Sequence, residues 1–387
     1  MKMKISEKYL LAHCIETLIE VQSNLKRTSI GRLIKKVDTA KDDSLFLDTL
    51  PEHTLKNKLT EDYDDDIVLI TEEKGVFNHQ VIKDAEIVIF ADPTDRSKHL
   101  KGFIEHQLKV DSRITPDSLL NDLYAENPIS AWQRFVGNRE DATLKKYYSS
   151  SVSDLSGPCC SFTIVKRGEL LFTLNLNYIT EKICIACEDF IKLFPVQDVI
   201  DPQTGKLLKN WHDKGTPIDF RQADQPTEYV TYIGKQEYQD YLQQTKLFDL
   251  NDYAPAEEAP GGPLRILYLA SINTLGIPGF IMSNGEKMGE WLGWIAFCKF
   301  SGAQLEAYSL YPGTTFAKDD ILMAPSPAYS IMEITKERLI INFDKLLYFQ
   351  NPSRYREMIL VTHRNNETIK QNVITPLQKA NKIRRLL

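Results

Sequence analysis

The sequence predicts an α/β (α+β) fold of the layered α/β/α/β sandwich kind. Three observations predict it: an amphipathic first segment, short apolar runs typical of buried strands, and alternating segments typical of an antiparallel sheet. The 387 residues are 42% hydrophobic and 26% charged, a composition typical of folded globular proteins rather than disordered or fibrous ones. This length suits two or three units, or one large fold of two layers.

Two helices and then two strands are expected in the first part of the chain. Apolar residues recur at intervals of three and four over residues 5–35, with Ser29 as a candidate end, and a second helix is expected at 44–62. Continuous β-branched runs at 67–70 and 87–90 predict strands that are covered on both faces. Each of these strands ends directly before acidic residues.

The rest of the chain adds an insertion, a meander and a second half. Residues 104–157 have a polar, helical pattern, which predicts an insertion or lid. Residues 159–190 alternate around a turn at Gly168, which predicts an antiparallel meander. The second half is expected to contain a strand at 265–269, a helix at 289–301, a strand at 358–362 and a helix at 367–384.

These patterns divide the chain into three parts. An N-terminal α+β half is expected at 1–195, and a C-terminal α/β half at 263–387. Residues 196–262, which are rich in Asp, Gln, Gly and Pro, are expected to be an irregular insertion or linker.

Composition excludes several classes of function. Lys and Arg number 47 against 53 Asp and Glu, a net charge of −6, so no basic field favours nucleic acid. No apolar window approaches the ~18 residues of a membrane span, and Glu7 and Glu16 interrupt the N-terminus where a signal peptide would be apolar. Six cysteines are too few for a disulfide scaffold. A cytoplasmic protein is expected, although one exported without a signal peptide would show the same pattern.

Carboxylates follow both predicted strands at the point where each ends. A Glu-Glu pair at 72–73 follows the first, and Asp92-Pro-Thr-Asp95 follows the second, where Pro93 is expected to make a tight turn. If the strands are neighbours, ~4.8 Å separates them, within reach of a shared Mg²⁺. Ser97 then follows where a helix can begin, whose free N–H groups favour phosphate. Each motif alone is common in turns and caps, but the two together are more specific.

With these motifs the chain resembles the inositol monophosphatase and fructose-1,6-bisphosphatase superfamily of Mg²⁺-dependent, lithium-sensitive phosphatases. That family has a Glu-Glu pair after a strand and then Asp-Pro-(Ile/Leu)-Asp-(Gly/Ser)-(Thr/Ser). Twenty positions separate Glu72 from Asp92, the spacing of the simpler members. The meander at 159–190 resembles the family's central strands, and the segment that begins at Met358 resembles its closing strand and helix. The insertion at 104–157 and most of the irregular segment lie outside the resemblance.

The resemblance implies a site for two or three Mg²⁺ ions. Glu72, Asp92 and the Thr94 carbonyl would hold the first ion, and Asp92 and Asp95 would bridge toward a second. The implied substrate is a small phosphomonoester, such as an inositol phosphate, a sugar bisphosphate or a 3′-phosphonucleotide. Many members form dimers or tetramers, so the resemblance allows a homodimer and leaves the oligomeric state open.

The resemblance also implies how water and phosphate are held. Ser97 and an upstream acid would orient a metal-activated water for in-line attack on phosphorus, while the second ion stabilises the leaving oxygen. Asp43 is the candidate for that acid, although it lies farther from Glu72 than in the simpler members. Backbone N–H groups of Arg96 and Ser97 would cradle the phosphate.

Two departures from the family pattern leave an alternative open. Arg96 stands where the family has a small residue, and its side chain could clamp a phosphate or fill the pocket and silence the site. The family's Trp-Asp motif aligns with Trp291, which puts Leu292 at the Asp position, or with Ser301-Gly302, which puts Glu290 there. Glu290 could bind Mg²⁺ beside the leaving group or simply favour the helix dipole, whereas Leu292 could not bind Mg²⁺.

The alternative is a pseudo-phosphatase that uses the fold to bind a sugar phosphate or a protein partner.

Other candidate site residues are expected to have structural roles. The cysteines at 159–160 and 184–187 are expected to be core residues rather than zinc ligands. His99 and His106 are expected at the surface, and Trp294 in the core.

Overall fold

The structure is a computed structural model that describes residues in both the N-terminal and the C-terminal part of the chain. It describes residues 6–37, 44–60, 67–71, 75–77, 85–124, 127–137, 157–201, 203–218, 230–231, 254–255, 280–302, 304–310, 332–335, 338–341, 356–365, 367, 370–379 and 383–385. The predicted strand at 265–269 lies outside these residues.

The N-terminal helices form as the apolar spacing predicts. Helix α1 (Glu7–Lys26) begins at Ser6, whose hydroxyl accepts a hydrogen bond from the Tyr9 N–H at 3.3 Å. The predicted break at Ser29 is confirmed, because Ser29 begins a second short helix, α2 (Ile30–Leu33). Helix α3 (Phe46–Thr60) matches the expected second helix. The buried sides of α1 and α3 share one core with the large sheet.

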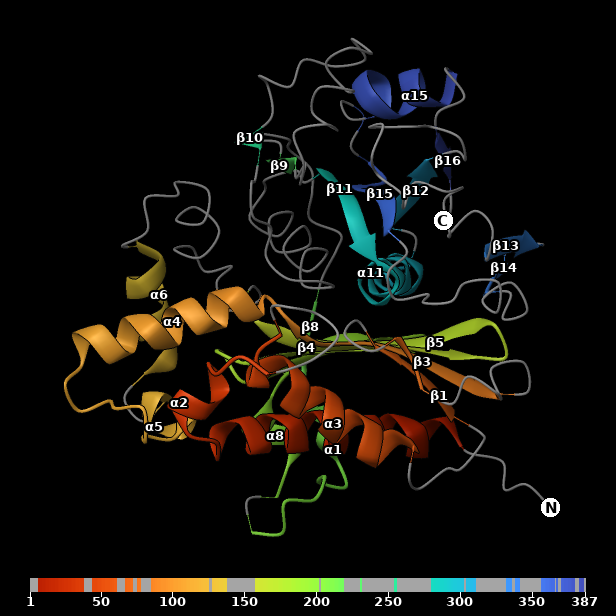
Figure 1. Cartoon of the computed structure of the whole chain (residues 1–387). Helices are drawn as coiled ribbons and strands as arrows, with labels where there is room; N and C mark the ends of the chain where they lie inside the picture. The colour runs from red at the N-terminus through yellow and green to blue at the C-terminus, as the bar shows by residue number, and fades with distance from the viewer. Residues whose placement is uncertain are drawn as a thin grey trace.

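One large sheet forms the centre of the N-terminal half (Figure 1). Its order is β2-β1-β3-β4-β5-β6-β7-β8, in which β1 and β3 are parallel and the other pairs are antiparallel. The hairpin of β13 and β14 joins it through β5. The bounds are β1 (Ile67–Thr71), β2 (Gly75–Val76), β3 (Ile87–Asp95), β4 (Cys159–Lys166), β5 (Glu169–Asn177), β6 (Lys182–Cys187), β7 (Ile191–Pro195), β8 (Thr216–Pro217), β13 (Met332–Thr335) and β14 (Arg338–Ile341). The predicted meander is therefore confirmed.

An apolar helix, α11 (Met288–Phe300), lies between the large sheet and a second, smaller sheet (Figure 1). It packs on β3, β4, β5 and β6 on one side and on the small sheet on the other. Leu292, Trp294 and Phe297 in α11 are fully buried, because sheets cover both sides of this helix. The predicted helix at 289–301 and the predicted core position of Trp294 are confirmed.

The small sheet has the order β11-β15-β12-β16, with all neighbours antiparallel. Its strands are β11 (Phe280–Lys287), β12 (Leu305–Leu310), β15 (Arg356–His363) and β16 (Ile383–Arg385). A π-helical turn, η6 (Lys370–Ile374), and α15 (Thr375–Lys379) lie beyond it (Figure 1). The layers therefore run helices, sheet, helix, sheet, as predicted, with a further helical segment outside.

The predicted C-terminal helix at 367–384 is wrong. Helix α15 ends at Lys379, and residues 383–385 form the edge strand β16 beside β12. Ile383 is buried there, and the Arg385 guanidinium pairs with the Glu306 carboxylate at 2.9 Å. The backbone groups on the edge of β12 thus gain partners that a helix would not give them, and this tertiary pairing overrides the local helical pattern.

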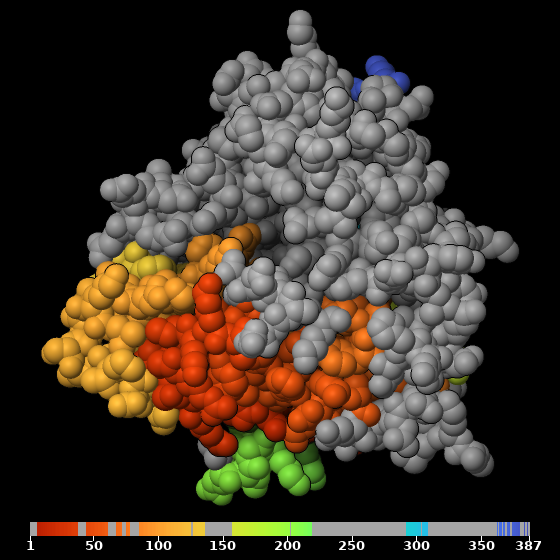
Figure 2. Space-filling view, viewed as in Figure 1, coloured from red at the N-terminus to blue at the C-terminus, as the bar shows by residue number. Residues whose placement is uncertain are grey.

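The helical pattern predicted over 104–157 is confirmed for the described part of that segment, and its first helix starts before residue 104. That the segment is an insertion or lid stays a prediction. Helix α4 (Ser97–Val110) starts directly after β3, and α5 (Leu120–Tyr124) and α6 (Pro128–Gly137) follow. Figure 2 shows these helices and the N-terminal helices side by side on one surface of the molecule. The remaining short elements are α8 (Val196–Val199), η3 (Trp211–Asp213), β9 (Val230–Thr231) and β10 (Ala254–Pro255). Within the described residues, no helix combines the length and apolarity needed to cross a bilayer.

Candidate metal and phosphate site

The two strands that precede the predicted acids are neighbours. Strands β1 and β3 pair in parallel, with Ile67 opposite Ile87 and Thr71 opposite Ala91. Their C-terminal ends therefore meet at the same edge of the sheet. Thr71 directly precedes Glu72 in the sequence, just as Ala91 precedes Asp92. Glu72 itself lies outside the described residues, so its predicted role as a ligand stays a prediction.

Asp92 and Asp95 share one face of the sheet because β3 contains a bulge. Strand β3 continues to Asp95, with Asp92 opposite Ser161 and Asp95 opposite Cys159, so one extra residue is accommodated on β3. Residues three apart in a regular strand would face opposite sides, and the bulge brings the two carboxylates back to the same side. The predicted tight turn at Pro93 is therefore wrong, because the strand continues through this residue as a bulge. A proline is tolerated there because a bulge leaves one residue without its ladder hydrogen bond.

This face of the sheet is the one that α11 covers. Ala91 belongs to the core shared with α1 and α3, so the alternation along β3 puts Asp92 on the opposite face. Asp92 is 3% exposed and Asp95 is 7% exposed. Two acidic side chains are thus enclosed together where the large sheet meets α11, an arrangement that favours binding of a cation.

Side chains from distant parts of the chain hold the bulge. The Thr94 N–H donates to Asp92 Oδ1 at 3.1 Å, and the Thr94 hydroxyl donates to the Leu47 carbonyl in α3 at 3.0 Å. The Tyr178 hydroxyl donates to the Pro93 carbonyl at 2.6 Å, and Tyr178 is almost fully buried. These bonds fix the backbone of the segment that presents both acids.

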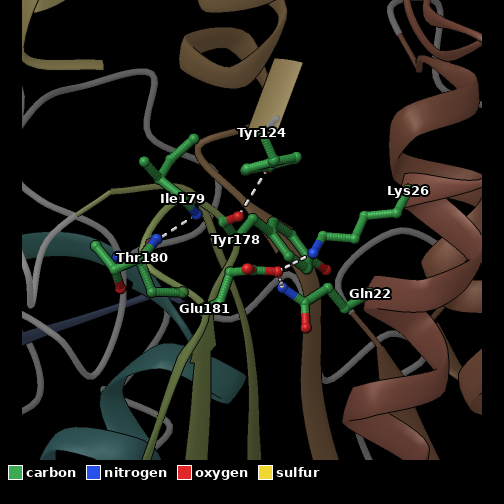
Figure 3. Close-up of polar contacts among 8 residues, drawn as sticks. Gln22, Lys26, Tyr124, Tyr178, Ile179, Thr180 and Glu181 are labelled. Atoms are coloured by element: carbon green, nitrogen blue, oxygen red, sulfur yellow. Dashed lines mark hydrogen bonds and ion pairs between the residues drawn. The ribbon is translucent and has the colours of Figure 1, made fainter. Parts of the chain in front are cut away.

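Tyr178 in turn belongs to a network at the end of the β5–β6 hairpin (Figure 3). The Tyr124 hydroxyl donates to the Tyr178 carbonyl at 2.7 Å. The Glu181 carboxylate accepts a hydrogen bond from Gln22 Nε2 at 2.7 Å and forms an ion pair with Lys26. Tyr178 therefore connects the bulge to α5, and Glu181, three residues farther along, connects the same hairpin to α1.

We expect Tyr178→Phe to lower the free energy of unfolding by about 1–3 kcal/mol, because it leaves the buried Pro93 carbonyl without its donor. Urea unfolding of the two proteins measures the difference. Tyr124→Phe is the matched control, since it also removes one tyrosine hydroxyl bond but at a site away from the bulge. A loss for Tyr178→Phe no larger than that of the control would contradict the role of Tyr178 at the bulge.

Helix α4 begins directly beside the acids, as the sequence predicts. Arg96 precedes its first residue, Ser97, and has a left-handed backbone conformation with φ of 64°. The Arg96 Nε lies 3.7 Å from Asp95 Oδ1. The first N–H groups of a helix have no partner within the helix, so the start of α4 brings donors next to the two carboxylates.

The thiol of Cys159 lies among the same groups. Its Sγ is 3.9 Å from Asp95 Oδ2. Burial raises the pKa of Cys159 well above its usual value, and the negative charges of Asp95 and Asp92 raise this pKa further, while contact with the Asn175 amide lowers it. Cys159 is therefore a neutral thiol that can donate weakly to Asp95, not a thiolate nucleophile.

The cysteines as a group are structural, as predicted. All six are free thiols, and five of them are buried. Within the described residues, no three His, Cys, Asp or Glu side chains form a group that could hold a metal. The acidic residues at 72–73 and Asp43 are not among the described residues, so the full predicted ligand set stays a prediction.

Stability should fall above about pH 9. Burial raises the pKa values of the Cys14, Cys160, Cys184 and Cys298 thiols above 9.0, so these thiols keep their protons in the folded protein when the unfolded chain loses them. The stabilisation is thus complete below pH 9 and is lost as pH rises, by up to about 1.4 kcal/mol per thiol per pH unit. Urea unfolding at pH 7.5 and pH 10 measures it.

Cys14→Ala serves as the control for that measurement, because it removes one of these thiols and should make the decline with pH shallower. An unfolding free energy that stays level from pH 7.5 to pH 10 would contradict the burial of the thiols as the cause.

Two further sequence predictions fall in α4 and α11. His99 was expected at the surface, but it is 6% exposed because it lies on the side of α4 that also buries Phe103. His106 is half-buried and its ring lies 5.6 Å from that of Phe135. Leu292, one of the two residues aligned with the family's Asp, is fully buried in α11. Glu290 lies in the first turn of α11, and its side chain is outside the described residues.

A cavity of about 500 Å³ lies elsewhere, among α4, α5 and α6. Its lining includes Asp111, Arg113 and Asp122 but neither of the buried acids of β3. Asp111 pairs with Arg113 at 2.7 Å, and Asp122 accepts from the Leu119 N–H at 2.7 Å. These polar groups support the local turns, so the cavity is not the candidate site.

Sequence reasoning missed the buried polar residues on the neighbouring strands. Ser161 and Asn175 are 1% and 0% exposed, and they continue the row of residues that starts at Asp92. The Ser161 hydroxyl makes no hydrogen bond in the described part of the chain, and the Asn175 amide lies beside the Cys159 thiol. Polar residues inside the apolar runs of β4 and β5 were the available signal, because such residues are rare in strands covered on both faces.

Comparison with known proteins gives matches among solved structures alone: no protein-family model and no curated protein matches the chain. The extragenic suppressor protein suhB from Bartonella henselae aligns 96% of this chain with 98% of its own at 11% identity and a TM-score of 0.48. A putative sedoheptulose-1,7 bisphosphatase from Toxoplasma gondii aligns 96% with 94% at 10% identity and a TM-score of 0.49. The fructose-1,6-bisphosphatase from Leishmania major aligns 97% with 94% at 11% identity and a TM-score of 0.49.

Proposed function

We propose that the protein is a Mg²⁺-dependent phosphatase that hydrolyses a small phosphomonoester. The observation that supports this most is the shared buried face of Asp92 and Asp95, at the edge of the sheet where β1 also ends and α4 begins. Carboxylates at such an edge attract a divalent cation, and a helix N-terminus attracts a phosphate.

The donor chemistry fits a hard divalent cation. Asp92 and Asp95 offer carboxylate oxygens, which Mg²⁺ prefers, and enclosure of both acids makes a compensating positive charge favourable. In the proposed site Glu72 and the Thr94 carbonyl complete the ligands near β3, and Glu290 serves the side of the leaving group. The cation, when bound, lowers the pKa of a water and neutralises charge on the phosphate.

The remaining roles are proposed for Asp43, for Ser97 and for the backbone at the start of α4. The Ser97 hydroxyl and the Asp43 carboxylate orient the attacking water, and Asp43 accepts its proton. The backbone N–H groups of Arg96 and Ser97 hold the phosphate oxygens. The α11 helix covers this face of the sheet and so excludes bulk water, which strengthens each of these electrostatic contacts.

Phosphate release across a panel of phosphomonoesters tests the proposal. The panel contains an inositol phosphate, a sugar bisphosphate and a 3′-phosphonucleotide, each with Mg²⁺, with EDTA, and with Mg²⁺ plus lithium. We expect turnover of at least one class that requires Mg²⁺ and falls with lithium. Turnover that is equal with EDTA and with Mg²⁺ would contradict a metal-dependent site.

A second candidate function is a pseudo-phosphatase that binds a sugar phosphate or a protein partner without hydrolysis. The contact between Arg96 and Asp95, and the burial of Leu292 at one of the aligned Asp positions, favour it. Two results together would support this candidate over the first. Folded protein would bind a sugar phosphate in a calorimetric titration, and it would release no phosphate from any member of the panel.

A further inference from the structure

Arg96 occupies a backbone position that suits glycine. Its φ of 64° lies in the left-handed region, which costs a residue with a Cβ about 1 kcal/mol or more in general. Arg167 has a similar φ of 51°, but it lies in the β4–β5 hairpin turn with a side chain that is 68% exposed. The Arg96 side chain is only 19% exposed, so it is held against the protein at the start of α4.

The Arg96 side chain points its charge toward one of the two enclosed acids. Its Nε lies 3.7 Å from Asp95 Oδ1, where Asp95 is 7% exposed. Asp92 lies on the same face, so this face encloses two carboxylates, and the Cys159 thiol beside Asp95 offers no positive charge. A guanidinium at this distance offsets part of that negative charge without a metal ion.

We propose that Arg96 is an internal counter-ion of Asp95 that competes with the divalent cation for this carboxylate. The competition rests on the proposed function, since it concerns the same site. A cation that binds Asp95 displaces the Arg96 guanidinium, which is then available to the phosphate of a substrate through its paired N–H donors. Arg96 therefore weakens binding of the cation alone and couples it to binding of phosphate.

Titration of Mn²⁺ into the protein by calorimetry, without substrate, tests the competition. Arg96→Gln removes the charge but keeps a long side chain at the left-handed position, so we expect it to bind Mn²⁺ roughly 3- to 10-fold more tightly than the natural protein. Arg96→Lys is the matched control, because it keeps the charge and should bind Mn²⁺ nearly as the natural protein does. Equal or weaker binding by Arg96→Gln would overturn the proposal.

A double-mutant cycle in metal-free protein separates this inference from the proposed function. The single variants Arg96→Gln and Asp95→Asn and their combination are compared by urea unfolding, and a favourable coupling between the two residues is expected. No coupling, with Mn²⁺ still bound, would overturn the counter-ion while leaving the phosphatase proposal intact. Coupling without Mn²⁺ binding by any of the proteins would overturn the metal site and the competition together, and leave a structural ion pair.

Titration of inorganic phosphate distinguishes a different role for the same residue. If Arg96→Gln weakens phosphate binding and leaves Mn²⁺ affinity unchanged, Arg96 is a phosphate ligand and not a counter-ion, and the proposal fails. Weaker phosphate binding together with tighter Mn²⁺ binding is the result that the proposal predicts.

Discussion

Asp92→Asn is expected to lower Mg²⁺-dependent phosphate release by about 10²- to 10⁴-fold, the loss typical when a metal ligand that stabilises charge is removed. Asparagine keeps the Oδ1 that accepts the Thr94 N–H at 3.1 Å, so the local backbone should keep its conformation. It removes the negative charge that the proposed cation needs. Initial rates of phosphate release and thermal unfolding of both proteins measure the two effects separately.

Asp122→Asn is the matched control for Asp92→Asn. Asp122 is also an aspartate whose side chain accepts a backbone N–H, that of Leu119 at 2.7 Å, but it is exposed and lies in α5. We expect its activity to be unchanged. Phosphate release by folded Asp92→Asn at the rate of the natural protein would remove Asp92 from the site.

Trp294→Ala is expected to lower the free energy of unfolding by about 3–5 kcal/mol. Trp294 is fully buried in α11, which packs on the large sheet on one side and the small sheet on the other. Its truncation therefore leaves a cavity in a helix that packs against both sheets. The strands of the two sheets cannot all move inward to fill this cavity. Urea unfolding, followed by circular dichroism, measures the loss.

The control for Trp294→Ala is Trp211→Ala. Trp211 is half-buried and packs its ring 5.4 Å from that of Phe194, outside the contact between the two sheets. Its truncation should cost less than that of Trp294. A smaller loss for Trp294→Ala than for Trp211→Ala would contradict the central position of α11.

The fold could be predicted from sequence where the pattern is local. The runs at 67–70 and 87–90 are continuous and apolar because strands β1 and β3 are buried along these residues, with α3 packed on both strands and α11 packed on β3. The C-terminal segment could not be predicted in this way. Residues 383–385 form a strand because the edge of β12 lies beside them, and that partner is far away in the sequence.

The candidate site likewise has parts that the local sequence pattern predicts and parts that depend on distant residues. Asp92, Asp95 and Ser97 are visible as a motif because acids follow both predicted strands at the point where each ends. A spacing of three could not show that both acids share a face, because that depends on the bulge opposite Ser161. Tyr178 is 85 positions from the Pro93 whose carbonyl it binds, and no local pattern indicates that contact.

The most direct test is a crystal soaked in Mn²⁺ and measured by anomalous scattering at the manganese edge. The account predicts an anomalous peak in contact with the carboxylates of both Asp92 and Asp95, with the Arg96 guanidinium moved away from Asp95. The account would be contradicted if no anomalous peak appears near Asp92 and Asp95 at a Mn²⁺ concentration that saturates the calorimetric titration. A peak only at another place in the protein would contradict it as well.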